Sequence, residues 1–482
     1  MTKLLAKNVV QYFLVFLIVG VALALRLYKI DNPIADWHSW RQADTASVSY
    51  FFVQSGIDFA HPRYHDISSV ATSFENPSGW RFVEFPIFNA IHAALFNTLP
   101  YFSFDKWGRL TSVIASLVSV VFMFLLGRRF ISPIGGLLAA SFFAILPFNI
   151  YFSRVVLPEP LAVASALAAL WFFVLWIDRQ KLLFILFSGV LFATALLVKP
   201  FTIFYALPML YLALAKFGIV GMLKRAELWF FLSLSLTPFF VWRAWMWNED
   251  FLRGIPHFIW VFNGDDIRFK PSFWWWIFSE RLGRLILGTW LAILFAIGLA
   301  KKFSKPGSSW FIHFFLLGQF LYVSIVATAS VRHDYYQTLI IPAVSLALAG
   351  GSIALWNITS LDTKLRRLLV IGSVCMGLVF SFYQVREFYK INHPEIVRAG
   401  QAVDKLIPKD ALILAPYNGD TAFLYQTRRS GWPHITLPID QMIERFGARY
   451  YVSVNFDQQT KDVMAKYQVL EKTDEYVVVK LR

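Results

Sequence analysis

The chain has 482 residues, of which 57% are hydrophobic, 18% are aromatic and only 16% are charged. A soluble fold of this length has too little interior to bury so many apolar side chains, which excludes an ordinary soluble protein. The net charge is +15, from 45 basic and 30 acidic residues. The distribution of these charges indicates membrane orientation and not binding to nucleic acid.

Apolar runs recur along most of the chain. A membrane-spanning helix needs roughly 20 mostly apolar residues to cross about 30 Å of hydrocarbon, because its backbone groups must be satisfied within the helix. The sequence therefore predicts an α-helical polytopic membrane protein of about 11 spans. The expected spans lie near 8–28, 108–127, 132–152, 158–177, 181–198, 201–215, 227–245, 285–300, 309–329, 335–356 and 368–385.

Basic residues gather in the short links on one side of these spans, and three acids dilute them. By the positive-inside rule this side is cytoplasmic, which places the amino terminus inside and the carboxyl terminus outside. The long loops near 29–107 and 246–284 and the tail after 386 then lie outside. The basic residues of the inner links are Lys3, Lys7, Arg128, Arg129, Arg179, Lys181, Lys216, Lys224, Arg225, Lys301, Lys302, Lys305, Lys364, Arg366 and Arg367.

The first outer loop contains two expected helices. The first covers 45–56, with Asp44 as a capping candidate, and the second covers 84–102. If the second helix crossed the membrane, every later basic link would face outward, so we expect it to lie at the interface or to re-enter.

The composition changes near residue 390, where short apolar strands begin to alternate with amphipathic helices. This pattern is typical of a small α/β fold. We expect a membrane domain at 1–388 and an extracytoplasmic α/β domain at 389–482. The single cysteine, Cys375, excludes an intramolecular disulfide and a cysteine-based metal cluster.

Polar residues collect at the outer ends of the expected spans. These are Arg41, Asp44, Glu84, Arg154, Glu159, Lys199 and the stretch Arg332 to Tyr336. Each has a structural alternative: Asp44 can cap the helix at 45–56, Glu159 between two prolines can simply begin a span, and Lys199 can snorkel to the headgroups. His333 and Asp334 can be solvated loop residues.

Together these side chains fit transfer of a sugar from a lipid-linked donor. A polyprenyl phosphate places its phosphate at the headgroup level, where Lys199 and Arg332 can bind it. Asp44 can then act as the general base for the acceptor hydroxyl, with Arg41 supporting the charge.

The order of several motifs resembles a known family. These motifs are WRQADTA, FVEFPIFNAI, GRR, SRVVLPEPLA, LLVKPF and RHDYYQTLIIPAVSLALAG, and the resemblance covers about residues 8–356. The sequence is similar to membrane glycosyltransferases of the GT-C fold. Within that fold it resembles the branch of protein O-mannosyltransferases, lipid A aminoarabinose transferases and rhizobial galacturonosyltransferase-like proteins.

The resemblance implies a polyprenyl-phosphate-sugar donor and an inverting transfer at the outer face of a bacterial inner membrane. It implies Asp44 as the base and Glu159 as a second acid in the site. The donor phosphate would be bound by Lys199, Arg332, His333 and Tyr335, with Arg41, Glu84 and Arg154 in supporting positions. The family is mixed in its need for a metal, so a divalent cation stays open; His38, His61, His65 and Asp66 share one loop, but their spacing does not support a metal site.

Two departures from the family pattern bear on specificity. Ala43 precedes Asp44 where many members carry a second acid, so one carboxylate must act as the base. Phe85 follows Glu84 where the aminoarabinose transferases have lysine, which removes a phosphate contact and argues against lipid A as the acceptor. The sugar and the acceptor, whether lipid, glycan or protein, are not indicated.

Two other functional classes are consistent with many apolar spans. A transporter or flippase of lipid-linked substrates would place ionisable groups near span centres and show internal repeats. Here the charges lie at span ends and we find no repeat. The second alternative is a noncatalytic membrane scaffold whose outer part binds a partner.

Overall fold

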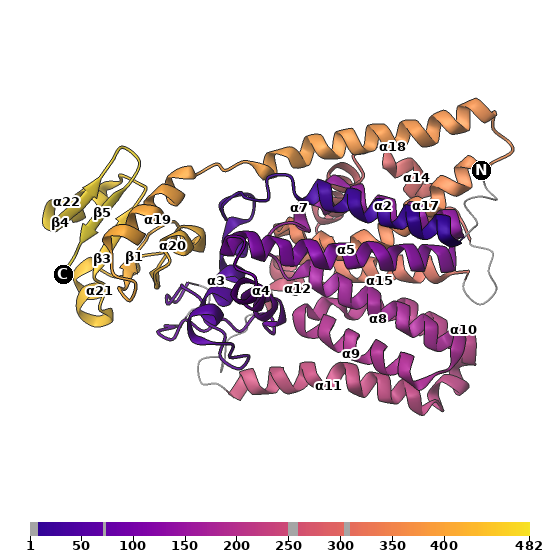
Figure 1. Cartoon of the computed structure of the whole chain (residues 1–482), viewed down its shortest axis with the longest axis horizontal. Helices are drawn as coiled ribbons and strands as arrows, with labels where there is room; N and C mark the ends of the chain where they lie inside the picture. Colours follow the sequence, from indigo (N-terminus) through magenta and orange to yellow (C-terminus); the bar gives the residue numbers. More distant parts are fainter. Residues whose placement is uncertain (1–7, 71–73, 249–258, 303–308) are drawn as a thin grey trace.

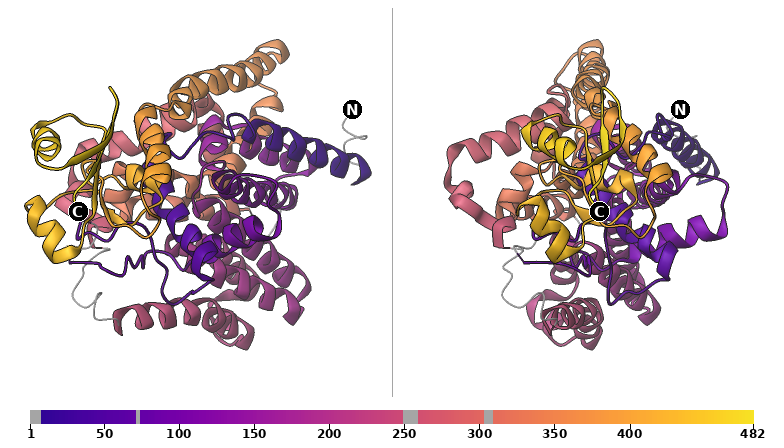
Figure 2. Two further views of the ribbon diagram at one scale, coloured as in Figure 1. Left: turned by 60° about the vertical axis from the view of Figure 1, so that its left-hand side comes forward. Right: turned by 90° about the vertical axis from the view of Figure 1, so that its left-hand side faces the viewer.

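The computed structural model describes residues 8–70, 74–248, 259–302 and 309–482. Long helices form a bundle, and the carboxyl-terminal strands and short helices lie beyond one end of it (Figure 1). Viewed along the bundle, the carboxyl-terminal elements lie in front of the helix ends (Figure 2). The α-helical membrane fold with a small carboxyl-terminal strand region is therefore confirmed.

The first half of the bundle follows the predicted apolar runs closely. Its helices are α2 (Asn8–Arg26), α5 (Phe104–Phe130), α6 (Pro133–Ile145), α7 (Pro147–Phe152), α8 (Glu159–Arg179), α9 (Leu182–Val198), the 3₁₀-helix η1 (Pro200–Tyr205), α10 (Ala206–Leu223) and α11 (Ala226–Asn248). The expected span at 132–152 is divided, because Pro147 begins α7 and has no N–H to continue the hydrogen bonds of α6.

The second half of the bundle is more irregular. It contains α12 (Ile259–Asn263), η3 (Gly264–Phe269), α13 (Pro271–Trp275), the π-helix η4 (Trp276–Ile286), α14 (Leu291–Ala300), α15 (Phe311–Ile325), α16 (Ala327–Arg332), η5 (Asp334–Ile340), α17 (Ile341–Trp356), α18 (Thr363–Val385) and η6 (Arg386–Tyr389). The expected span at 285–300 is a broken pair, since the helical stretch ending at Ile286 and α14 meet at a bend of 120°.

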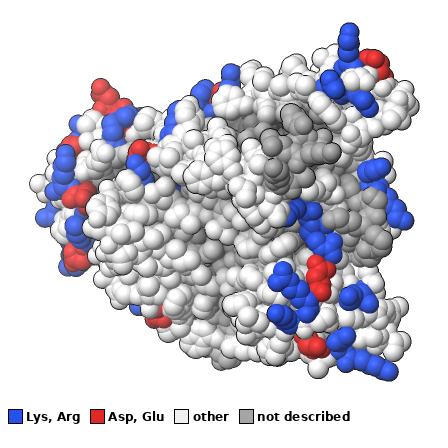
Figure 3. All heavy atoms as spheres, turned by 45° about the vertical axis from the view of Figure 1, so that its right-hand side comes forward, with Lys and Arg blue, Asp and Glu red and all other residues white. Residues whose placement is uncertain are grey.

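Within the described residues, six helices are long and apolar enough to cross a membrane, and the bent pair would make a seventh. Three shorter apolar helices, α6, α9 and α15, accompany them. The count of 11 spans thus stays a prediction. On the face shown in Figure 3, charged side chains gather toward the two ends of the molecule, and a broad surface between them has few. This is the pattern expected when lipid covers the middle of the bundle.

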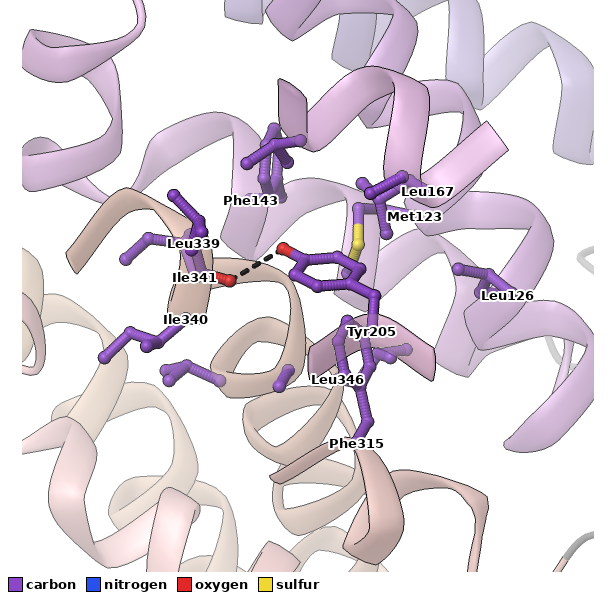
Figure 4. Close-up of a cluster of buried hydrophobic side chains, with 14 of the residues drawn as sticks. Met123, Leu126, Phe143, Leu167, Tyr205, Phe315, Leu339, Ile340, Ile341 and Leu346 are labelled. Carbon is purple, nitrogen blue, oxygen red and sulfur yellow. Dashed lines mark hydrogen bonds between the residues drawn. The ribbon is translucent and has the colours of Figure 1, made fainter. Parts of the chain in front are cut away.

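The bundle is held by close packing and by satisfied polar groups. Tyr205 lies deep among Met123, Phe143 and Phe315, and its hydroxyl donates a 2.7 Å hydrogen bond to the Leu339 carbonyl (Figure 4). Without this partner the buried hydroxyl would cost about 1–3 kcal/mol. Helices α14 and α17 approach so closely that a Cβ on Gly351 would lie 1.8 Å from the Leu294 carbonyl oxygen, so the contact requires glycine.

The first outer loop folds into two helices, α3 (Ser39–Ser55) and α4 (Ile87–Thr98). Helix α4 has 12 residues, so it is about 18 Å long and too short to cross the hydrocarbon. Helix α3 begins at Ser39, which places Asp44 inside the helix. Capping of a helix at 45–56 by Asp44 was therefore the wrong interpretation.

The carboxyl-terminal region contains a five-stranded mixed sheet in the order β2-β1-β3-β5-β4. Strand β1 pairs in parallel with β2 and β3, whereas β5 pairs antiparallel with β3 and β4. The elements are α19 (Pro394–Leu406), β1 (Ile413–Leu414), α20 (Thr421–Thr427), β2 (Gly431–Trp432), α21 (Ile439–Phe446), β3 (Tyr450–Ser453), α22 (Gln458–Lys466), β4 (Gln468–Lys472) and β5 (Val477–Lys480). The predicted alternation is confirmed; β2, β4 and α20 were not predicted.

Candidate active site

A buried ion pair joins Lys199 and Glu159. Helices α8 and α9 are antiparallel neighbours joined by a short link, so the beginning of α8 and the end of α9 lie at the same level. Glu159 is the first residue of α8 and Lys199 follows α9, with 2.6 Å between Lys199 Nζ and Glu159 Oε1. Both side chains are nearly inaccessible. Lys199 is therefore not a lysine snorkelling to water, and Glu159 does more than begin a span.

Glu84 links this pair to the first outer loop. Its carboxylate lies 3.4 Å from Lys199 Nζ and forms an ion pair with Arg41 of α3. Burial alone would raise the pKa of Glu84, but the charges of Arg41 and Lys199 outweigh burial and lower the pKa to about 2. Glu84 is therefore ionised throughout the physiological pH range and fixes both cations.

Aromatic rings complete the surroundings of Lys199. Its Nζ lies 4.7 Å from the ring centroid of Tyr336 and 5.7 Å from that of Tyr335, at distances suited to cation–π attraction. His333 stacks on Tyr335 with 5.5 Å between ring centroids. The predicted residues His333 and Tyr335 are thus brought to the Lys199 side of the site.

Asp44 lies one turn beyond Arg41 on α3 and has two partners. Arg81 Nη2 lies 2.7 Å from Asp44 Oδ2, and the Thr421 hydroxyl donates to Asp44 Oδ1 at 2.7 Å. Arg41, Asp44, Arg81 and Glu84 line one narrow pocket. The Asp44 carboxylate and the Lys199 group of ion pairs are therefore neighbouring parts of one site.

Two predicted residues lie elsewhere. Arg154 is buried 3.6 Å from Asp36, which also pairs with Arg109 at 3.1 Å, so its contacts belong to packing beneath the loop. Arg332 is exposed and lies 3.5 Å from Asp265. Asp334, interpreted as a possible solvated residue, is instead buried, where it pairs with Arg281 and accepts a 2.8 Å hydrogen bond from Trp37 Nε1.

Sequence reasoning missed Arg81 and Thr421. Arg81 stands three residues before Glu84, in the same segment as a predicted motif, so its position was a usable signal. Thr421 is 377 residues from Asp44 and reaches it because α20 packs on α3. No local pattern marks such a contact.

The described residues contain no group of three or more His, Cys, Asp or Glu side chains arranged to hold a metal ion. His65, for example, contacts the Ser47 hydroxyl at 2.7 Å, whereas His61 pairs with Asp58 at 3.0 Å.

Comparisons with known proteins bear on the fold. A family model described as dolichyl-phosphate-mannose-protein mannosyltransferase matches residues 86–245. The crystal structure of ArnT from Cupriavidus metallidurans bound to undecaprenyl phosphate is similar with a TM-score of 0.65 and 14% identity, covering 97% of each chain. The Archaeoglobus fulgidus oligosaccharyltransferase AglB, in complex with an inhibitory peptide and a dolichol-phosphate, has a TM-score of 0.57 and 9% identity, covering 92% of this chain and 69% of that one.

No curated protein sequence matches the chain. The solved structures align over nearly its whole length, through the bundle and the carboxyl-terminal region alike. The family model covers the segment from α4 to α11, which includes Glu159 and Lys199. The chain therefore has the GT-C fold, and its residues 86–245 match the family model described as dolichyl-phosphate-mannose-protein mannosyltransferase.

Proposed function

We propose that the chain is an inverting glycosyltransferase that moves a sugar from a polyprenyl-phosphate donor to a hydroxyl of a lipid, glycan or protein acceptor. The observation that carries the proposal is the meeting of Arg41, Lys199 and Asp44 at the ends of the membrane helices, through Glu84 and one narrow pocket. The fold shared with ArnT, which was crystallised with undecaprenyl phosphate, supports a lipid-phosphate donor.

The charge change of the reaction explains the need for cations. The donor is a phosphodiester with one negative charge, and the leaving polyprenyl phosphate is a monoester that approaches two. Cations held in place before the reaction stabilise the added charge without reorganising. Glu84 and Glu159 hold Arg41 and Lys199 in such fixed positions.

The transfer is a single displacement. The Asp44 carboxylate accepts the proton of the acceptor hydroxyl while the hydroxyl oxygen bonds to the anomeric carbon. The bond between that carbon and the phosphate oxygen breaks, and its electron pair leaves with the polyprenyl phosphate. One displacement inverts the anomeric configuration. Arg81 and Thr421 hold the Asp44 carboxylate in its orientation.

The proposed location is the outer face of a bacterial inner membrane. The basic links at the opposite helix ends support a cytoplasmic position for that side. The carboxyl-terminal α/β region would then lie outside, over the site, as a domain beginning near residue 389.

The proposal is tested with purified protein in detergent. The donors are a panel of undecaprenyl- and dolichyl-phosphate sugars, the acceptor pool is an extract of bacterial envelope lipids and glycans, and the readout is release of free polyprenyl phosphate. We expect release by the wild type and a loss of at least 100-fold in Asp44→Asn. The matched control is Asp58→Asn, which removes an exposed carboxylate of the same loop and should keep full activity.

The assay tests both the assignment of Asp44 as the base and the transfer itself. Release that survives Asp44→Asn in a monodisperse variant contradicts the assignment of the base. Absence of release with every donor contradicts the proposed transfer. In that case movement of the labelled donors across vesicles would favour a flippase, and its absence would favour a scaffold.

A further inference from the structure

A second cavity adjoins Asp44, and Lys199 does not line it. It has a volume of about 330 Å³ and opens between the first outer loop and the segment that leads into α20. This volume lies in the range of pockets that hold small molecules. The lining residues that carry the argument are Trp40, Asp44, Tyr64, Asp66, Arg81 and Asp420.

The cavity is acidic. Asp44, Asp66 and Asp420 line it against one arginine, and that arginine is already paired with Asp44. Burial raises the pKa of both Asp66 and Asp420 to about 6, and the charge of Asp44 contributes to each shift. Three carboxylates thus face one guanidinium, so the cavity carries a net negative charge at neutral pH and repels phosphates and carboxylates.

The same lining suits a sugar. Trp40, which is partly exposed, provides aromatic surface for the apolar face of a ring, and ionised carboxylates accept hydrogen bonds from hydroxyl and ammonium groups. Because Asp44 lines this cavity as well as the narrow pocket with Arg41 and Glu84, a hydroxyl held here can reach the base.

We propose that this cavity binds the acceptor, and that the acceptor end is a saccharide free of phosphate and carboxylate groups, either neutral or an amino sugar. The inference rests on the proposed function and adds the class of acceptor to it. The carboxyl-terminal region takes part directly, since Asp420 and Thr421 form one wall.

Binding is measured without turnover, by cysteine labelling. Val70 lies on the cavity rim and is 46% exposed, so Val70→Cys in a Cys375→Ser background provides a single reactive thiol. The probes are methanethiosulfonate reagents carrying either an ammonium or a sulfonate group, with rates normalised to those of a free thiol in solution. We expect the cationic reagent to react at least fivefold faster than the anionic one.

The charge of Asp420 is tested by a conservative variant with a matched control. Asp420 caps α20 by accepting the Ala422 N–H at 2.7 Å, and asparagine caps equally well, so Asp420→Asn removes charge alone. The control is Asp457→Asn, which changes the equivalent cap of α22 outside the cavity. The cation preference should fall at least twofold in the first variant and stay unchanged in the second.

Saccharides are then added as protecting ligands. Methyl glucoside and methyl glucosaminide should slow labelling of Val70→Cys, and glucose 6-phosphate at equal ionic strength should not. Protection by the phosphate ester that equals or exceeds protection by the methyl glycosides overturns the proposal, and so does the absence of protection by every saccharide. Protection without any release of polyprenyl phosphate would retain the saccharide site and refute the transfer, whereas release without protection would do the reverse.

Discussion

Lys199 and Glu159 form an ion pair that is sealed from solvent where α9 ends and α8 begins, with 2.6 Å between nitrogen and oxygen. Removing one partner of a buried pair leaves an uncompensated charge and costs about 3–5 kcal/mol. Glu159→Gln and Lys199→Met should each lower the thermal unfolding temperature in detergent. The double variant should recover most of that loss, because both charges are gone.

An activity assay distinguishes two roles of Lys199, namely neutralising Glu159 and binding the donor phosphate. If Lys199 served only to neutralise Glu159, the double variant would regain glycosyl transfer together with stability. We expect it to be stable and inactive, since no cation remains at this position to bind the donor phosphate. Recovery of polyprenyl phosphate release in the double variant would contradict a role for Lys199 in donor binding.

The depressed pKa of Glu84 predicts a loss of stability in acid. Burial opposes ionisation, but Arg41 and Lys199 lower the pKa from its ordinary 4.5 to about 2. The ionised group therefore stabilises the fold above pH 4.5, and its contribution of about 3 kcal/mol disappears as the pH falls toward 2. The free energy of unfolding, measured from pH 7 to pH 3, should fall in the wild type until it approaches that of Glu84→Gln. If the difference in free energy of unfolding between the two proteins stayed constant over that range, the pairing of Glu84 with Arg41 and Lys199 would be refuted.

Asp420 should have the opposite effect on the pH dependence of stability, because its pKa is raised and not lowered. Burial raises its pKa from 3.8 to about 6; the hydrogen bond from the Ala422 N–H opposes this shift, and the nearby charge of Asp44 adds to it. A raised pKa means that stability is fully present below pH 3.8 and is lost as the pH rises through 6. Asp420→Asn should therefore be more stable than the wild type at pH 7, by about 1–3 kcal/mol, and equal to it near pH 4.

Thr421 is expected to act as a positioning residue for Asp44. Thr421→Val keeps the shape of the side chain and removes the hydroxyl that donates to Asp44 at 2.7 Å. A hydrogen bond to a charged group contributes about 1.5–3 kcal/mol, so kcat should fall at least tenfold while KM for the donor changes little. Thr421→Ser should restore kcat. Failure of serine to restore it would show that the methyl group matters and not the hydroxyl.

The sequence predicted that Arg332 binds the donor phosphate, whereas the structure places it on the surface beside Asp265. Its side chain is 55% exposed and its ion pair is with Asp265, also exposed. Such surface pairs contribute at most about 1 kcal/mol. Arg332→Ala should keep transfer within twofold of the wild type, measured in the same release assay, whereas a loss comparable to that of Lys199→Met would return Arg332 to the donor site.

The apolar runs predicted most of the helices, because the membrane imposes one length and one composition on every crossing. The α/β pattern after residue 390 was equally readable. Glu159 and Lys199 were singled out because polar residues collect at one membrane face, where snorkelling explains a lysine but an acid at the mouth of a span costs desolvation. The division of the span at 132–152 was signalled by Pro147, but the continuous hydrophobicity on both sides concealed it.

The partners of the site residues were beyond sequence reasoning. Arg154 was expected at the site and instead meets Asp36, while Asp334 was interpreted as a possible loop residue and is buried against Arg281. These contacts depend on how helices far apart in the chain pack together. A single sequence records which residues carry charge, but the choice of partner among many similar charges is made by packing.

The hydrogen bond between Asp44 and Thr421 also bears on the order in which the site forms during biosynthesis. A ribosome makes α3 long before α20, because Thr421 is the 377th residue after Asp44. Until α20 is made, the cavity beside Asp44 lacks the wall that holds Asp420. The site is therefore completed only when α20 folds against α3, and a copy whose synthesis stops before α20 has Asp44 but lacks Asp420 and Thr421 beside it.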